Sequence, residues 1–313
     1  MSEAESLNES PICFYHGADN DGKLSGALIK LYYEDCGENV EMYPFDYGQT
    51  FPWELVKGRE VIMVDLALQP FSEMVKLKAE ASVLIWIDHH ASAIDEYSKL
   101  EDQNMGGVQN VKFAACEFTW MFRPDNARIP HTQIPFGIKM VGRYDVWDHS
   151  NPDALPFKYG LEARQIDPSK SDCDWDLIRA MEEGSPELVC EVLREGRIMH
   201  KYAQADFKRY AESAAFDTVI DGHRVVALNR MYGGSQSIES VFKKGVHEFM
   251  VAFGYMPKSN NQWTVGMYSD EGLIDLGALA KKFGGGGHKG AAGFQIGTEG
   301  ISKLCSGELN PPQ

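Results

Sequence analysis

An apolar stretch in the N-terminal half of the chain ends abruptly in one carboxylate and two imidazoles, at Asp88, His89 and His90. Two earlier apolar stretches end in side chains of the same kind. The three stretches with the residues that follow them are 12–15 with His16, Asp19 and Asp21, 61–64 with Asp65, and 83–87 with Asp88, His89 and His90. Open α/β folds place their chemistry at the carboxyl edge of the sheet, where such strands end. Carboxylates and imidazoles gathered there predict a metal site, and imidazole favours Mn²⁺, Co²⁺ or Fe²⁺ over Mg²⁺.

Asp19 and Asp21 also have an explanation that needs no metal. They lie two residues apart just before an expected helix, where aspartates form turns and cap helices. Gly22 frees the backbone at the point where that helix starts. Because Asp65 and residues 88–90 stand at equivalent strand ends, we interpret the whole set as a metal site.

The hydrophobic pattern predicts strands that alternate with helices in the first half of the chain. We expect strands at 12–15, 40–47, 60–64 and 82–87, and helices at 24–34, 71–80, 114–122 and 134–147, with Pro152, Pro156 and Pro168 punctuating the region that follows. Strands alternating with helices indicate right-handed crossovers and a parallel sheet.

The second half of the chain has a different pattern. Residues 186–216 read as one long helix that connects two domains, although an ordinary core helix would look similar. Beyond it we expect a hairpin of strands 218–220 and 225–229 around Asp221-Gly222, a helix at 235–244, strands at 248–255 and 262–268, a helix at 275–283, and a closing strand at 293–296. This mixture predicts a smaller mixed-sheet α/β domain. The predicted boundaries are a disordered tail at 1–10, a first domain at 11–185, a connecting helix at 186–216 and a second domain at 217–313.

The composition limits the function classes. The net charge of −16 argues against a protein that grips long nucleic acids along their phosphates, although bound cations would still admit small anionic substrates. Solubility alone also explains the acidity. The six cysteines form no C-x-x-C pair, which disfavours structural zinc and a disulfide framework. The polar N-terminus does not look like a signal peptide, and no apolar run reaches the ~20 residues that span a membrane, so we expect a cytoplasmic protein without membrane partners.

Four motifs in this order resemble the DHH/DHHA1 phosphoesterase family. They are His16-x-x-Asp19-x-Asp21-Gly22, the lone Asp65, Asp88-His89-His90, and Gly285-Gly286-Gly287-His288-Lys289-Gly290-Ala291-Ala292-Gly293. The resemblance spans residues 12–296. The spacing between the first histidine and aspartate is one residue shorter than the commoner form and is similar to that of the nano-RNase branch, which includes oligoribonucleases of the B type. The stretch Tyr144-Asp145-Val146-Trp147 also resembles that branch, although its usual second acidic residue is replaced near Arg143.

This resemblance implies a DHH domain at 11–185 that binds two divalent metal ions. Mn²⁺ is the expected ion, with Co²⁺ or Mg²⁺ as alternatives. The implied ligands are His16, Asp19 and Asp65 for one ion, and Asp21, Asp65, His89 and Asp145 for the other, so that Asp65 bridges the pair. Two ions held in this way lie ~3.5–4 Å apart and lower the pKa of a shared water that then attacks phosphorus.

The catalytic residues implied are Asp65, Asp88 and His90. Asp88 is expected to orient a histidine rather than to bind metal. His90 is expected to face the substrate phosphate, and the alternative is a buried, hydrogen-bonded histidine.

The resemblance also implies a DHHA1 domain at 217–313 that binds substrate. Backbone N–H groups of a glycine run form anion-binding concavities, although most such runs are flexible loops. The substrate-binding candidates are His90, Arg230, Ser235, Gly286, Gly287, His288 and Lys289. Arg230 and Ser235 lie near an expected helix start, where anions bind, although an exposed arginine is more often a solvated charge.

The function implied is a metal-dependent phosphodiesterase that degrades very short oligonucleotides and dinucleotides to mononucleotides from the 3′ end. Rivals with the same chemistry are a cyclic- or linear-dinucleotide phosphodiesterase, a 3′-phosphoadenosine 5′-phosphate phosphatase and a pyrophosphatase. A nucleotide-binding sensor without turnover is the rival from another class. The expected partners are a short single-stranded oligonucleotide or dinucleotide and, as an option, a second copy of the chain, and no long duplex.

Overall fold

The structure, a computed structural model, describes residues 10–122, 130–148, 150–257, 262–269 and 274–311. The chain divides into two compact units, Met1–His200 and Lys201–Gln313, and each is described by itself. Apart from Ser10, the predicted tail at 1–10 lies outside the described residues.

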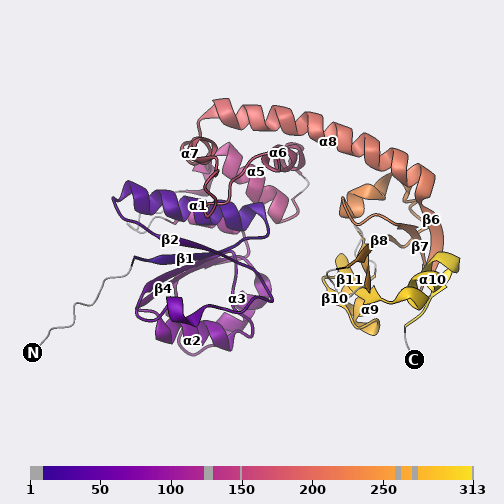
Figure 1. The fold of residues 1–313 in the computed structure, drawn as a ribbon, viewed down its shortest axis with the longest axis horizontal. Helices are drawn as coiled ribbons and strands as arrows, with labels where there is room; N and C mark the ends of the chain where they lie inside the picture. Colours follow the sequence, from indigo (N-terminus) through magenta and orange to yellow (C-terminus); the bar gives the residue numbers. More distant parts are fainter. Residues whose placement is uncertain (1–9, 123–129, 149, 258–261, 270–273, 312–313) are drawn as a thin grey trace, which may run out of the picture. The chain divides into compact units, whose positions relative to one another are not determined.

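The first unit contains a sheet of five parallel strands (Figure 1). In the spatial order β2-β1-β3-β4-β5 the strands are β2 (Glu41–Phe45), β1 (Ile12–His16), β3 (Glu60–Val64), β4 (Val83–Asp88) and β5 (Gly106–Gln109). The predicted parallel sheet is therefore confirmed. From β1 the chain goes to β2 on one side of β1, and then crosses to β3 on the other side of β1. Open α/β sheets bind their ligands at such a switch point, outside the carboxyl ends of the strands.

Both faces of this sheet are buried, which explains why its strands read as continuous apolar runs. Ile12 and Phe14 of β1 point into one core, and Cys13 and Tyr15 point into another. Helices α2 (Ser72–Glu80) and α3 (Ala91–Ser98) cover the first face, and α1 (Asn20–Asp35) covers the second (Figure 1).

Further helices pack around α1 and form a separate apolar core. They are α4 (Ala115–Met121), α5 (Phe136–Asp145), α6 (Ala154–Leu161) and α7 (Trp175–Glu183). The sequence pattern does not predict α6 because Pro156 reads as a breaker. Pro156 instead lies in the first turn of α6, where a helix does not need the backbone N–H that proline lacks.

Helix α8 (Pro186–Ala214) is the long helix predicted from the sequence, and it runs from the first unit into the second (Figure 1). No helix among the described residues combines the length and the apolar character that crossing a membrane requires.

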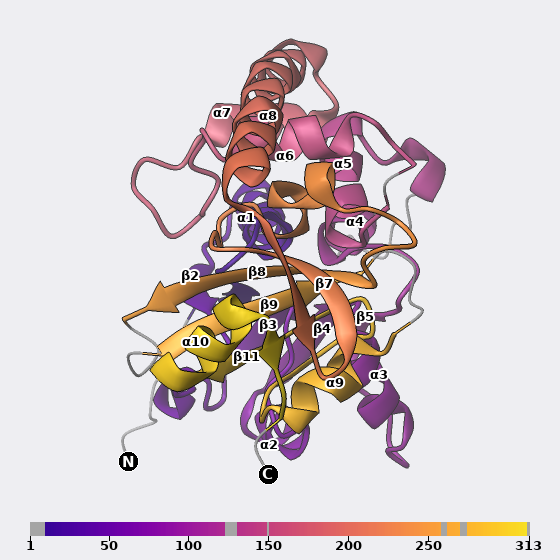
Figure 2. The same cartoon turned by 90° about the vertical axis from the view of Figure 1, so that its right-hand side faces the viewer.

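The second unit contains a seven-stranded mixed sheet, as predicted. Its spatial order is β10 (Gly286–Gly287), β11 (Ala291–Ile296), β9 (Gln262–Tyr268), β8 (Phe249–Met256), β7 (His223–Leu228), β6 (Phe216–Ile220) and β12 (Glu308–Leu309). The β7–β8 and β6–β12 pairs are parallel and the other pairs antiparallel. Helices α9 (Leu276–Lys282) and α10 (Thr298–Ser306) pack on one face, which lies toward the viewer in Figure 2. The C-terminal part of α8 packs on the other face through Ala211.

Two expectations for the second unit are wrong. The helix expected at 235–244 is instead two short 3₁₀ turns, Gly234–Ser237 and Glu239–Val241. Its serines compete with a regular helix by bonding nearby backbone, as Ser237 does when its hydroxyl donates to the Gly234 carbonyl at 2.7 Å. Strand β11 does not close the unit either, because α10 and β12 follow it.

Candidate metal centre

Strand ends place carboxylates and imidazoles together at the carboxyl edge of the first sheet. His16 is the last residue of β1, Asp65 directly follows β3, and His89 and His90 directly follow β4. Asp65 has a φ of 60°, which is uncommon for a residue with a Cβ and is best tolerated by aspartate and asparagine. Its backbone N–H still donates to the Ile87 carbonyl at 2.9 Å, so the turn is anchored to β4. Strain of this kind gathers at functional sites.

One group of possible ligands consists of His16, Asp19 and Asp65. His16 Nδ1 lies 2.9 Å from Asp19 Oδ2 and 3.6 Å from Asp65 Oδ2. The three ligand atoms come from the end of β1, the cap of α1 and the end of β3.

A second group consists of Asp21, His89 and Asp145. His89 Nε2 lies 3.2 Å from Asp145 Oδ2 and 3.6 Å from Asp21 Oδ2. It also lies 3.2 Å from Asp65 Oδ1. Asp65 therefore turns one oxygen toward each group, which is the arrangement that a bridging carboxylate requires.

The residues of both groups fit divalent cations. His16 Nδ1 and Asp65 Oδ1 are buried and have no hydrogen-bond partner among the described residues. Buried polar atoms rarely remain unsatisfied, and those that do call for an ion or a water. Two imidazoles and four carboxylates also form a mixed nitrogen and oxygen donor set of the kind that Mn²⁺ and its neighbours accept.

The pKa values of the site reflect its negative charge. The carboxylate of Asp19, and then that of Asp65, raises the pKa of His16 to about 10. Burial raises the pKa of Asp145 to about 7, and the charge of Asp65 adds to the effect. Carboxylates this close together repel one another when both are charged, which favours the protonated forms of the carboxylates and histidines. Metal ions bind the deprotonated groups and compete with those protons.

Asp88 lies behind the two histidines and fixes their backbone. Its Oδ1 accepts the N–H groups of His89 at 2.8 Å and of His90 at 3.2 Å. The same oxygen lies 2.7 Å from His90 Nδ1, and this bond raises the pKa of His90 to about 9. The side chain of His90 is 37% exposed, so the ring is held on one side and reaches solvent on the other.

Asp19 and Asp21 accept backbone N–H groups at helix starts, and both also face histidines of the candidate metal centre. Asp19 Oδ1 caps α1 by accepting the Gly22 N–H at 2.9 Å, while its Oδ2 faces His16. Asp21 is buried, and its two oxygens accept the backbone N–H groups of Ala115 and Cys116 at 2.9 and 2.8 Å, at the start of α4. In Asp19 the capping oxygen and the oxygen that faces His16 are different atoms, whereas Asp21 Oδ2 both accepts the Ala115 N–H and faces His89 Nε2.

We expect Gly22→Ala to destabilise the first unit and to weaken metal binding. A Cβ at this position would lie 2.2 Å from the His16 carbonyl oxygen and 2.5 Å from the His16 Cβ, so the first turn of α1 would have to move off β1. Overpacking of this kind costs about 2–3 kcal/mol. Chemical denaturation and Mn²⁺ titration measure the two effects. Gly297→Ala is the control, because nothing lies within 4 Å of its Cβ. An unchanged denaturation midpoint and Mn²⁺ affinity in Gly22→Ala would contradict the packing described.

Asp46 also lies at this site, and the sequence patterns did not reveal it. Asp46 directly follows β2, and its Oδ1 is buried 3.7 Å from His16 Nε2. It follows the same rule as Asp65, a carboxylate directly after an apolar strand. The expected strand at 40–47 ran past Asp46 and hid that signal. Tyr47, the next residue, is exposed and lies edge-on to His16, with ring centroids 5.8 Å apart.

The second half of the glycine run of the second unit is a strand. Gly286 and Gly287 form β10 and pair with Gly293 and Ala292 of β11. Gly287 has a φ of 139°, and a Cβ there would lie 2.5 Å from the Ala292 Cα, so only glycine fits. The side chains of His288 and Lys289, which follow directly, are exposed.

Arg230 and Ser235 have neighbours that the sequence did not reveal. Arg230 Nη2 lies 2.9 Å from Asp206 Oδ2, and its guanidinium lies over the ring of Phe207 at 4.8 Å. Arg230 thus ties α8 to the end of β7. Ser235 lies in a four-residue 3₁₀ turn and is half-buried. A phosphate contact of either residue stays a prediction.

No protein-family model matches the chain, and no curated protein matches it either. Solved structures do. PggH, a pGpG-specific phosphodiesterase from Vibrio cholerae, aligns over 95% of this chain and 97% of its own with 14% identity and a TM-score of 0.54. An exopolyphosphatase-related protein from Bacteroides fragilis aligns over 96% of this chain and 91% of its own, with 13% identity and a TM-score of 0.53. Exonuclease RecJ bound to manganese aligns over 95% of this chain and 88% of its own, with 13% identity and a TM-score of 0.50.

These three structures align over nearly the whole of this chain, so the likeness covers both units. The resemblance that the motifs indicate is therefore confirmed for the fold, in both units. At identities this low the likeness concerns the fold, and the chemistry has to be argued from the side chains of this chain.

Proposed function

We propose that this chain is a metal-dependent phosphodiesterase that hydrolyses dinucleotides and very short oligonucleotides to mononucleotides. The observation that carries the proposal is that Asp65, at the switch point of the first sheet, faces His16 through Oδ2 and His89 through Oδ1 and so lies between the two ligand groups. Two divalent cations in such groups supply a nucleophilic water near neutral pH and neutralise charge on the phosphoryl oxygens.

Each side chain of the site has a role in this proposal. One cation would be held by His16, Asp19 and Asp65, and the other by Asp21, Asp65, His89 and Asp145. Asp88 keeps the ring of His90 oriented through its Oδ1, and the exposed side of that ring binds the substrate phosphate. Mn²⁺ is the proposed ion because two imidazoles take part, and the manganese-bound RecJ neighbour supports this choice.

Three observations support a short substrate. The net charge of −16 disfavours binding along many phosphates. The structural neighbour PggH is pGpG-specific, so its fold serves a dinucleotide. In the second unit, the exposed side chains of His288 and Lys289 follow the glycine strand β10 and offer hydrogen-bond donors for a substrate phosphate. The proposed 3′-to-5′ direction rests on the resemblance to the nano-RNase branch.

A substrate panel tests the proposal most directly. The protein is incubated with each substrate in the presence of Mn²⁺, and the products are separated by chromatography. The substrates are 5′-labelled RNA and DNA from dinucleotides to ten-mers, pGpG, cyclic dinucleotides, pyrophosphate and 3′-phosphoadenosine 5′-phosphate. We expect mononucleotides from the dinucleotides and falling rates as the substrates lengthen. Release of phosphate only from pyrophosphate or from the bisphosphate nucleotide would identify one of the rival phosphatases. No turnover of any compound would leave the sensor as the better hypothesis.

A further inference from the structure

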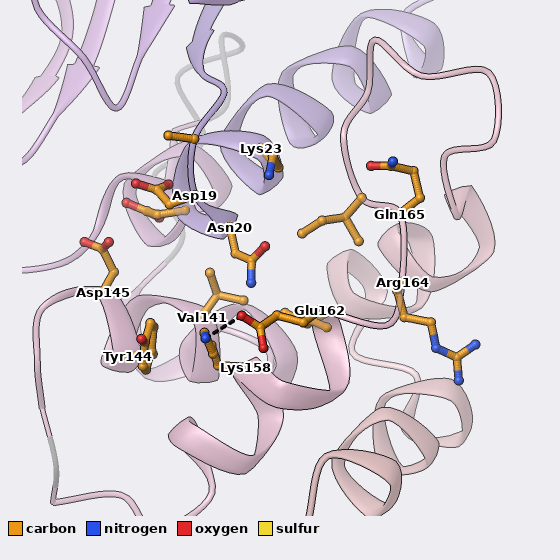
Figure 3. A pocket seen from close by; sticks show the side chains of 14 residues that line it. Asp19, Asn20, Lys23, Val141, Tyr144, Asp145, Lys158, Glu162, Arg164 and Gln165 are labelled. Atoms are coloured by element: carbon orange, nitrogen blue, oxygen red, sulfur yellow. Dashed lines mark ion pairs between the residues drawn. The ribbon is translucent and has the colours of Figure 1, made fainter. Parts of the chain in front are cut away.

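A cavity of about 450 Å³ lies beside the metal centre, within the first unit (Figure 3). Asp19, Asp21 and Asp145 of the candidate metal centre form part of its wall. The rest of the wall comes from the first turn of α1, from α5 and α6, and from the segment that follows α6. Small-molecule pockets have volumes of about 300–1,000 Å³, so the cavity suits one small molecule rather than a polymer. A substrate bound at the metal centre could extend into it directly.

Lys23 is the basic side chain of this cavity that the protein leaves unpaired. It is half-buried and makes no ion pair or hydrogen bond with any residue of the described ranges, although Asp19 lies four residues earlier. The other two cations of the wall are engaged. Lys158 pairs with Glu162 at 2.5 Å, and Arg164 pairs with Glu195 at 2.7 Å. Figure 3 shows the Arg164 guanidinium turned away from Lys23, and Lys158 joined to Glu162.

Lys23 is thus a half-buried cation without a partner among the described residues, in a chain with a net charge of −16. Lysine is seldom buried without a partner, because its charge loses hydration there. An anion bound in the cavity would supply the missing partner. The N-terminal end of α1 adds partial positive charge on the same side, which favours an anion further.

The remaining polar groups of the cavity suit a nucleobase. Asn20 stands three residues before Lys23 and so shares its face of α1. Figure 3 shows the two side chains on the same side of the cavity. Gln165 uses its oxygen to accept the Asp167 N–H at 3.1 Å, which leaves its NH₂ group to donate. Amide side chains of this kind recognise the edges of bases. Val141 and Tyr144 give the wall an apolar part for the face of a base.

We propose that this cavity binds one nucleotide of the substrate, with the Lys23 ammonium on its phosphate and the amides of Asn20 and Gln165 on its base. The inference rests on the proposed function, because it assigns one side of the scissile phosphate to this cavity. Lys23 is then a binding residue that holds the mononucleotide part before and after hydrolysis.

The test measures binding of the product rather than turnover. The Mn²⁺-loaded full chain is titrated calorimetrically with guanosine monophosphate, adenosine monophosphate, guanosine and inorganic phosphate. We expect a monophosphate to bind more tightly than either guanosine or phosphate alone. A hydrogen bond to a charged group contributes about 1.5–3 kcal/mol, so Lys23→Ala should weaken monophosphate binding about 10- to 100-fold. Lys23→Arg should restore most of the affinity. Lys57→Ala, at an exposed lysine of the same unit, should change nothing.

Chemical labelling supplies a second readout. Acetylation of Lys23, followed by mass spectrometry, should slow when a nucleoside monophosphate is present, while acetylation of Lys57 should not. Equal monophosphate affinity in the wild type and Lys23→Ala would overturn the proposal. Phosphate that binds as tightly as the nucleotide would overturn the base contact. Neither measurement needs hydrolysis, so the two proposals can fail separately. The substrate panel tests the phosphodiesterase activity, and the titrations test nucleotide binding in this cavity.

Discussion

Asp65→Asn should abolish nearly all phosphodiesterase activity and remove the metal ions. Asp65 is the side chain that faces both ligand groups, with Oδ2 toward His16 and Oδ1 toward His89. An asparagine keeps the shape of the side chain and tolerates the φ of 60°, so the substitution removes the charge without straining the backbone. Cations at such a site contribute several kcal/mol to transition-state stabilisation, which corresponds to a loss of about 10³-fold or more in kcat. Metal analysis of the purified variant and steady-state kinetics measure both effects.

The matched control is Asp95→Asn. Asp95 is exposed on α3 in the same unit, and among the described residues its carboxylate pairs with Lys99 alone. We expect this variant to keep wild-type kinetics and metal content, since exposed ion pairs contribute little. If Asp65→Asn retained both ions and more than a tenth of the wild-type rate, a bridging role for Asp65 would be excluded.

His89→Ala should remove one ion and leave the other. His89 Nε2 contacts the carboxylates of Asp21 and Asp145, whereas the group of His16 and Asp19 does not depend on it. The variant should therefore bind about one Mn²⁺ per chain, and kcat should fall on the order of 10²- to 10³-fold. Isothermal titration with Mn²⁺ separates this result from that of Asp65→Asn, where binding at both positions weakens.

His223→Ala is the control for that variant. His223 lies in the second unit, contacts Glu248 at 2.9 Å and belongs to neither ligand group. It should bind two ions with unchanged affinity. A His89→Ala protein that also bound two ions with wild-type affinity would remove His89 from the ligand set.

The position of the site could be predicted because it depends on strand ends. His16, Asp65 and His89 each stand at or just after the end of an apolar strand, and parallel strands bring these ends to one edge. The spacing of the hydrophobic residues and the composition also predicted the long helix α8 and the mixed sheet of the second unit, because both depend on sustained hydrophobic patterns.

Features that depend on contacts between distant residues could not be predicted. Asp21 accepts N–H groups from Ala115 and Cys116, 94 and 95 residues later, and no local pattern records that contact. Arg230 reads as a free surface cation until Asp206 and Phe207 of α8 are seen beside it. The short helices α6 and α7 gain their stability from packing around α1, because helices of this length are marginal by themselves.

The central claim is that two cations share Asp65, and anomalous diffraction from Mn²⁺-soaked crystals tests it directly. We expect two manganese peaks about 3.5–4 Å apart. One should contact His16 and Asp19, the other Asp21, His89 and Asp145, and both should contact Asp65. A single peak, or two peaks that do not share Asp65, would contradict this account.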